Sequence, residues 1–213
     1  MSNIADLRKE YKLRNLDEAD ISDNPISLFS VWWDDAMHSQ IDEVNAMTLA
    51  TVKTDGTPTG RVVLLKGYDE NGFVLYTNYE SDKGKELVQN NKACLIFYWK
   101  ELERQVRITG TVVKNSDEEN DEYFNSRPEG SKIGAWSSPQ SSPIKDRSVI
   151  EKNVVKYQEQ FKDKPVTRPP HWGGYKVIPT SIEFWQGRPS RLHDRILYTL
   201  QADESWKIER LAP

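Results

Sequence analysis

Short runs of alternating apolar and polar residues dominate the middle of the chain and predict extended strands. These runs are 46–53, 61–66, 73–78, 93–99 and 104–114. The dipeptides Asp55-Gly56 and Asn71-Gly72 lie between the first three runs, and such dipeptides are typical of tight hairpin turns. The pattern therefore predicts an antiparallel meander.

Apolar residues at helical spacing interrupt the strands and predict four helices. We expect these helices at 28–37, 81–90, 116–127 and 147–162. Ser27 is placed to cap the first helix, and Ser116 with Glu119 forms a capping box at the start of the third. Pro128 and Gly130 are expected to end that third helix.

Alternation returns near the C-terminus and predicts four more strands, at 172–178, 181–185, 191–200 and 206–211. Many short strands without regular βαβ alternation favour a mainly β, antiparallel barrel with peripheral α-helices. We expect one such domain over residues 25–213. Residues 1–24 are highly charged with few large apolar side chains, which predicts a mobile arm that could become a lid.

Charge and composition exclude several classes of protein. The 213 residues carry 29 Lys plus Arg against 33 Asp plus Glu, a net charge of -4, which argues against a general nucleic-acid binder. No run approaches the roughly 20 apolar residues of a membrane span. The single cysteine, Cys94, excludes an intramolecular disulfide and is expected to be buried and inert. These features predict a cytoplasmic protein without nucleic-acid or membrane partners.

The three histidines, His38, His171 and His193, lack the close spacing of a zinc site, so we expect no metal. Residues 184–195 instead concentrate three arginines, His193 and Asp194 in one turn. Guanidinium groups suit phosphate or carboxylate, and imidazole exchanges protons near neutrality. A strand starting at 191 would place Arg191, His193 and Arg195 on one face. The alternative is a solvated turn paired with Asp194, which composition alone favours.

Other cations have spacings that suit anions. Arg61 and Lys66 bound one strand at odd spacing, so they would lie on opposite faces and serve different anions, unless they are only snorkelling strand ends. Tyr123 and Arg127 are helix neighbours followed by Ser131, a set that suits phosphate but is also common in surface packing. A further lysine, Lys83, lies near a predicted helix start, where free backbone N–H groups favour anions.

Ten short stretches with specific sequences are spread over nearly the whole chain. They are 61–66, 76–78, 103–106, 123–128, 133–136, 140–142, 172–174, 183–187, 191–195 and 209–213. Together they resemble the pyridoxine/pyridoxamine 5'-phosphate oxidase family, which uses FMN to make pyridoxal 5'-phosphate. The resemblance implies an FMN-binding split barrel in a homodimer, with FMN at the subunit interface and residues of both chains in each site.

The resemblance also implies a role for individual residues. The implied FMN contacts are Arg61, Val62, Val63, Leu64, Tyr76, Thr77, Lys83, Gln105, Gln140, Ser141, Trp185 and Arg195. The implied ligands of the substrate phosphate are Lys66, Tyr123, Arg127 and Ser131. Arg191 and His193 would be catalytic and lie against the pyridine ring, while Arg8 and Tyr11 belong to an arm that can fold over the substrate.

The implied reaction is oxidation of pyridoxine or pyridoxamine 5'-phosphate by oxygen, with release of hydrogen peroxide and, from the amine, ammonia. The alternatives are a split-barrel flavin reductase and a non-catalytic carrier of FMN or pyridoxal phosphate. Two sets of phosphate ligands and the turn at 191–195 favour the oxidase. One residue departs from the family pattern, because Asp82 stands where an arginine is usual. We expect Asp82 to face solvent or pair with a lysine, and FMN affinity to be lower than usual.

Overall fold

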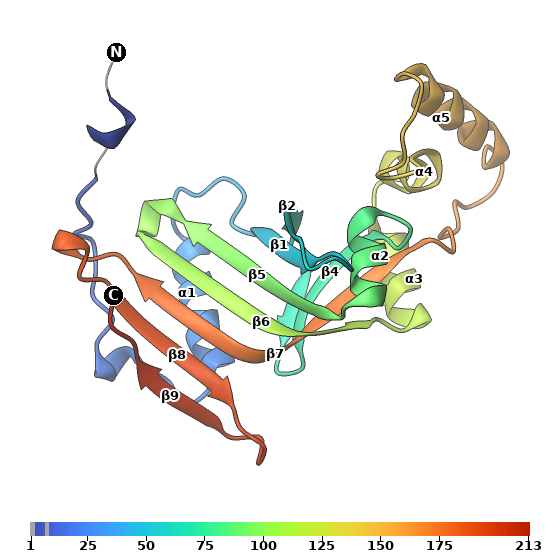
Figure 1. Cartoon of the computed structure of the whole chain (residues 1–213). Coiled ribbons are helices and arrows are strands. Elements are labelled where there is room, and N and C mark those ends of the chain that lie inside the picture. Colours follow the sequence, from blue (N-terminus) through green and yellow to red (C-terminus); the bar gives the residue numbers. More distant parts are fainter. Residues whose placement is uncertain (1–2, 7–8) are drawn as a thin grey trace.

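A computed structural model describes residues 3–6 and 9–213. Nine strands form one sheet in the path β2-β1-β5-β6-β7-β4-β3, with β8 paired to β7 and β9 to β8 (Figure 1). Every pairing is antiparallel. The strands are β1 Ala46–Val52, β2 Pro58–Leu64, β3 Gly67–Asp69, β4 Gly72–Asn78, β5 Lys92–Trp99, β6 Arg104–Lys114, β7 Trp172–Gln186, β8 Asp194–Leu200 and β9 Trp206–Arg210. The architecture is the antiparallel split barrel with peripheral helices that the sequence predicts.

Five α-helices surround the sheet, and α4 and α5 project together beyond one end of it (Figure 1). They are α1 Pro25–Met37, α2 Asp82–Gln89, α3 Asp117–Ser126, α4 Glu129–Ser137 and α5 Ser148–Gln160. The capping box of Ser116 and Glu119 at α3 is confirmed. Among the described residues, no helix is both long and apolar enough to cross a membrane.

Helix α1 packs its aromatic face on the sheet and builds the centre of the core. Phe29 is fully buried, and its ring lies 5.0 Å from Phe73 and 5.5 Å from Phe97, between centroids. The cap of α1 differs from the prediction, because the side chain of Asn24, not Ser27, accepts a hydrogen bond from the N–H of Ile26 at 2.7 Å. Pro25 occupies the first helical position, where its missing N–H costs nothing, and so the helix starts earlier than its apolar spacing indicates.

Proline also misled two other predictions. β7 is one strand rather than two, because it pairs with β6 on both sides of Pro179 and accommodates the proline at a register shift opposite Thr109 and Gly110. Pro128 does end α3, but it also starts α4, a helix that was not predicted. Ser131 therefore lies in the first turn of α4 rather than in a loop.

Cys94 is partly exposed, contrary to its expected burial.

The part of the N-terminal segment that follows residue 8 runs along the sheet end that carries the C-terminus (Figure 1). Leu16 is only 1% exposed, and its N–H donates to the carboxylate of Asp194 at 3.1 Å. The hydroxyl of Tyr198 donates to the carbonyl of Ser22 at 2.7 Å. These contacts anchor residues 16–22 to β8, while the division into an arm and a domain stays a prediction.

Candidate functional site

A cavity of about 620 Å³ lies between β2, β4 and the helices α2 and α4. We call it the cation cavity, because Arg61, Lys83 and Arg127 all line it. The predicted cofactor ligands in its wall are Arg61, Val62, Val63, Tyr76, Thr77, Lys83 and Gln140. Arg127 and Ser131, which were predicted to bind the substrate phosphate, are in the same wall.

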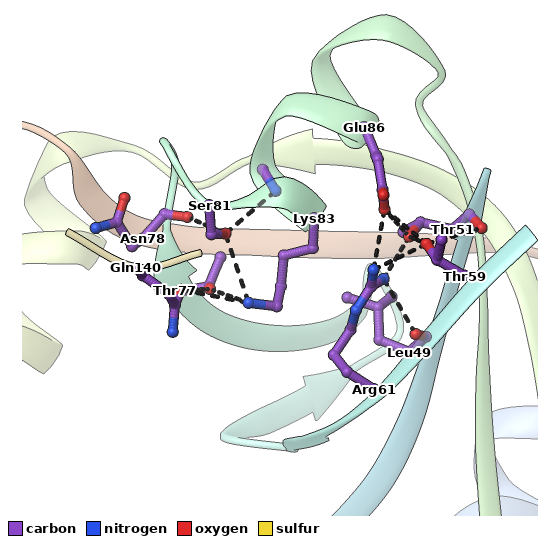
Figure 2. A network of polar contacts seen from close by, with 11 residues as sticks. Leu49, Thr51, Thr59, Arg61, Thr77, Asn78, Ser81, Lys83, Glu86 and Gln140 are labelled. Carbon is purple, nitrogen blue, oxygen red and sulfur yellow. Dashed lines mark hydrogen bonds and ion pairs between the residues drawn. The ribbon is translucent and has the colours of Figure 1, made fainter. Parts of the chain in front are cut away.

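Lys83 is held at the start of α2 and points toward β4 (Figure 2). Its Nζ donates to Thr77 Oγ1 and to Gln140 Oε1, both at 3.3 Å. The helix start itself is fixed by Ser81, whose hydroxyl accepts from the N–H of Gly84. Burial and the neighbouring Arg61 lower the pKa of Lys83. An anion placed here would relieve the repulsion between the two cations.

Arg61 points from β2 toward a buried carboxylate of α2, that of Glu86 (Figure 2). Glu86 is 5% exposed and accepts from Arg61 Nη2 at 3.0 Å and from Thr59 Oγ1 at 2.8 Å. Thr51 also donates to this carboxylate. Burial by itself raises the pKa of Glu86, but the hydrogen bonds from Thr51, Thr59 and Arg61 outweigh it, so the pKa lies below its ordinary value. The charged carboxylate therefore fixes the orientation of Arg61.

Arg127 lies at the opposite wall, against an aromatic stack. Its guanidinium carbon is 4.5 Å from the ring centroid of Trp172. Tyr76 stacks on both Trp172 and Tyr123, with centroid distances of 5.3 and 3.9 Å, and these two rings are stacked at 6.2 Å from each other. Burial lowers the pKa of Arg127, and within the described part of the chain its buried Nη1 has no hydrogen-bond partner. A buried donor left unpaired costs about 1–3 kcal/mol, so this atom marks a place for an acceptor.

A smaller cavity of about 330 Å³, which we call the side cavity, adjoins the same aromatic stack. Lys66 and Tyr123 line it, and Tyr76 lines both this cavity and the cation cavity. Lys66 follows β2 instead of ending it, because the strand stops at Leu64. Arg61 and Lys66 line different cavities. Lys66 lies beyond the end of β2, where its N–H donates to the carbonyl of Val74 on β4, so strand alternation is not what separates the two cations.

A third cavity, of about 630 Å³, is formed by different elements. We call it the histidine cavity, and its wall includes Tyr11, Trp185, Arg191 and His193. The His193 ring lies 4.5 Å from the Trp185 ring and 5.8 Å from the Tyr11 ring, between centroids. His193 Nδ1 accepts the backbone N–H of Arg188 at 3.1 Å, so a neutral ring carries its proton on Nε2. Burial and Arg191 lower the pKa of His193, against the opposing effect of Asp194.

The turn before β8 differs from the predicted strand start. β8 begins at Asp194, and Arg191 lies in the 3-10 turn Pro189–Arg191, so the prediction that Arg191, His193 and Arg195 share a strand face was wrong. Ser190 and Arg191 have φ values of +56° and +62°. Left-handed backbone at residues other than glycine costs on the order of 1–3 kcal/mol and is concentrated at functional sites. The strain at Arg191 supports a functional role for this turn.

The remaining predicted cofactor ligands lie elsewhere. Gln105, Trp185 and Arg195 are cross-strand neighbours on β6, β7 and β8, and in the described structure none of them lines the cation cavity. Leu64 ends β2, and Ser141 follows Gln140 with a φ of +69°. Arg8 lies outside the described residues. The structure thus brings the predicted ligands together in two groups rather than one.

Buried carboxylates are the residues that sequence reasoning missed. Besides Glu86, Glu183 is buried in β7 and pairs with Arg195 at 2.9 Å and with Arg107 on β6. The sequence did contain a signal for the buried site of Glu86, because Thr51 and Thr59 place hydroxyls at facing positions of two paired strands. Asp82, by contrast, is exposed to solvent as expected.

Two family models cover most of the chain. The pyridoxamine 5'-phosphate oxidase model matches residues 33–161, and the model of the pyridoxine 5'-phosphate oxidase C-terminal dimerisation region matches residues 172–213. The chain belongs to the pyridoxine/pyridoxamine 5'-phosphate oxidase family. The histidine cavity takes Trp185, Arg191 and His193 from the dimerisation region, whereas Arg61, Lys83 and Arg127 come from the first match.

Relatives within the oxidase family match over their full length. The pyridoxine/pyridoxamine 5'-phosphate oxidase of Paraburkholderia phymatum is 57% identical over 213 residues, and that of Burkholderia mallei is 55% identical over 215, with 100% of each chain covered. Among solved structures, PhzG from Burkholderia lata 383, in complex with tetrahydrophenazine-1-carboxylic acid, has a TM-score of 0.89 at 28% identity and covers 96% of this chain and 100% of its own. An FMN-binding, oxidase-related protein of Nostoc punctiforme shares the fold, with a TM-score of 0.70 at 18% identity, covering 91% and 100%.

The names of the homologues mark the family as one of oxidoreductases. Among residues 3–6 and 9–213, no group of three or more His, Cys, Asp or Glu side chains is placed to hold a metal ion. The cation cavity offers donors that suit phosphate groups, namely Arg61, Lys83 and the unpaired Nη1 of Arg127.

Proposed function

We propose that the protein oxidises pyridoxine 5'-phosphate or pyridoxamine 5'-phosphate to pyridoxal 5'-phosphate with oxygen, using FMN. The observation that carries this proposal is the group of four cations around Tyr76. Arg61, Lys83 and Arg127 line the cation cavity, Lys66 lines the side cavity, and Tyr76 lines both. Four cations beside one shared aromatic side chain would neutralise two dianions, one from a cofactor and one from a substrate.

The residues present fit an FMN phosphate. Lys83 is already hydrogen-bonded to Thr77 and Gln140, and Arg61 is already oriented by Glu86, so little side-chain freedom would be lost on binding. The unpaired Nη1 of Arg127 is a donor that the substrate phosphate would satisfy, together with Lys66, Tyr123 and Ser131. Val62, Val63, Leu64 and Ser141 are proposed to line the flavin end of the site.

The chemistry that FMN would supply when bound is a two-electron oxidation, in which a hydride leaves the 4'-carbon of the substrate and oxygen is finally reduced to hydrogen peroxide. The protein's own part is to bind and orient. Arg191 would lie over the pyridine ring and hold it in place. His193 lines the cavity with its Nδ1 bound to the N–H of Arg188, so its Nε2–H would orient the substrate or move a proton. Burial and Arg191 lower the pKa of His193, which favours the neutral ring.

We further propose that each site is shared by two copies of the chain. Gln105, Trp185 and Arg195 lie outside the cation cavity, so one chain cannot apply all the predicted ligands to one cofactor without a partner. Large apolar side chains beside the two cavities are exposed, with Val62 at 70% and Leu192 at 68%. The matched dimerisation region supports an arrangement in which a partner chain covers these side chains.

A flavin reductase, an FMN carrier and an oxidase of tricyclic carboxylates such as the PhzG ligand are the competing functions. The decisive experiment mixes the FMN-loaded protein with each phosphorylated vitamer under argon and follows the yellow flavin absorbance. We expect bleaching by a vitamer, then recovery on admission of air with one peroxide and one aldehyde per turnover. Bleaching by a nicotinamide cofactor alone, by a reduced tricycle alone, or by none of these would contradict the proposal.

The exposed Asp82 gives a prediction about cofactor affinity. Asp82→Arg replaces a negative charge beside Lys83 with a positive one, so it should tighten FMN binding by about 3-fold at low ionic strength, the scale of an exposed charge pair. Fluorescence titration of the apoprotein with FMN measures this constant. Glu159→Arg makes the same charge change on the exposed surface of α5 and serves as the matched control. Equal affinities of the Asp82→Arg variant and the wild type would show that position 82 does not act on the phosphate.

A further inference from the structure

The buried carboxylate of Glu103 contacts the N-terminal segment. Glu103 is 2% exposed and lies between β5 and β6, in a left-handed backbone conformation with a φ of +55°. Its carboxylate accepts the backbone N–H groups of Lys12 and Leu13 at 2.8 and 3.1 Å. The ammonium of Lys9 completes the set at 3.2 Å. Three donors from one short segment thus converge on a single side chain.

Tyr11 lies within this segment and forms part of the histidine cavity. Its ring is 5.8 Å from the Trp185 ring, edge to face, and also contacts His193. Its hydroxyl lies 3.4 Å from that of Tyr98, and this contact together with burial raises the pKa of Tyr98 to about 12. Tyr11 therefore lines the histidine cavity in contact with both Trp185 and His193.

Gly187 provides the space for Tyr11. A Cβ at position 187 would lie 2.7 Å from Tyr11 Cγ, and its three nearest neighbours would all be atoms of the Tyr11 side chain. The N–H of Gly187 in turn donates to the carbonyl of Glu103 at 2.7 Å. Glu103 consequently binds the arm through its side chain, and it binds Gly187, on which Tyr11 packs, through its backbone carbonyl.

We propose that Glu103 is a positioning residue that latches the N-terminal arm and sets Tyr11 over the histidine cavity. The consequence for catalysis rests on the proposed function, since Tyr11 would then close the site over the substrate, whereas the latch itself does not depend on it. Burial raises the pKa of Glu103, but the bonds from Leu13, Lys9 and Lys12 outweigh burial and lower it overall, so the latch is charged at neutral pH. A charged acceptor of two N–H groups and one ammonium is stronger than a neutral one.

The first test is cleavage of the arm by trypsin in the full-length, ligand-free protein. Lys9, Lys12 and Arg14 are cleavage sites inside the latched segment. Glu103→Gln keeps the size of the side chain but removes its charge, so cleavage there should be about 10-fold faster, because hydrogen bonds to a charged acceptor are stronger than those to a neutral one. Glu101→Gln is the matched control, an exposed glutamate two residues away, and should leave the cleavage rate unchanged.

The second test reaches the arm from the other side. Gly187→Ala adds one methyl group whose three nearest neighbours are all atoms of Tyr11, so it should displace the arm and raise the cleavage rate while the side chain of Glu103 is unchanged. Gly187→Ala also tests the latch if Glu103→Gln destabilises the whole fold, which a lower melting temperature in circular dichroism would reveal. Wild-type cleavage rates in Gly187→Ala, and in any folded Glu103→Gln protein, would overturn the latch.

Steady-state kinetics separate positioning from a merely structural role. In the FMN-loaded enzyme, Glu103→Gln should raise KM for the phosphorylated vitamer about 5-fold and change kcat by less than about 2-fold, because closure adds binding more than chemistry. In a Tyr11→Ala background the same substitution should add nothing further to KM. An equal rise in KM with and without Tyr11 would refute positioning through the arm. Absence of all turnover in the wild type would refute the proposed function instead and leave the trypsin result standing.

Discussion

Arg191→Met should lower kcat by about 100-fold while FMN remains bound, which is the scale on which one positioned polar group acts in a transition state. The guanidinium lines the histidine cavity beside His193, and Arg188, another arginine of that wall, is already paired with Asp194. Methionine is similar in length and inherits the same φ of +62°, so the substitution removes the charge and leaves the strained turn in place. The fall in kcat therefore measures the contribution of the Arg191 side chain alone.

The pH profile gives this substitution a second readout. Arg191 lowers the pKa of His193, although burial is the larger cause. Removing the guanidinium should raise that pKa, so the acidic limb of kcat, along which His193 loses activity as it gains a proton, should move to higher pH. Stopped-flow flavin reduction between mildly acidic and mildly alkaline pH measures both effects. Arg147→Met, on the exposed end of α5, is the control. Near-normal turnover, or loss of FMN, would contradict the assigned role.

The fold was predictable where local chemistry decides it. Asp55-Gly56 and Asn71-Gly72 predicted hairpins, and both glycines have positive φ, at +84° and +136°. Prediction failed where a proline has two meanings. Pro128 ends one helix and starts the next, and Pro179 lies within a continuous strand because its partner strand shifts register there. Such outcomes depend on the neighbouring strand or helix, which a local pattern does not contain.

The site was predictable as a set of residues but not as an arrangement. Arg61, Lys83 and Gln140 do converge, but Trp185 and His193 face another cavity, and no spacing in the sequence separates the two groups. The carboxylates that hold the cations were missed for a related reason. Glu86 has the pattern of a solvated helix residue until Thr51 and Thr59 from paired strands, together with Arg61, provide it with donors.

Arg127→Met should raise KM for the phosphorylated vitamer about 30-fold, because the buried Nη1 is a charged donor that only the substrate phosphate would satisfy. The protein should remain folded, since that nitrogen has no partner to lose among the described residues and methionine keeps the packing on Trp172. The measurement is kcat/KM at low substrate concentration with FMN saturating. Lys132→Met, next to the same helix start but with its Nζ bound to the carbonyl of Asn125, is the control.

Combining the two substitutions tests whether each site is shared between chains. Chains carrying Arg127→Met and chains carrying Arg191→Met bear different affinity tags, are co-expressed, and the dimer that holds one of each is purified. If the cation cavity of one chain works with the histidine cavity of its partner, one site of this dimer carries both defects and the other carries neither. Its kcat/KM per dimer should then recover to roughly half that of the wild type, although both parent proteins are strongly impaired. A dimer no more active than the mean of its parents would place each complete site within a single chain, against the separation of Arg127 and Arg191 into two cavities.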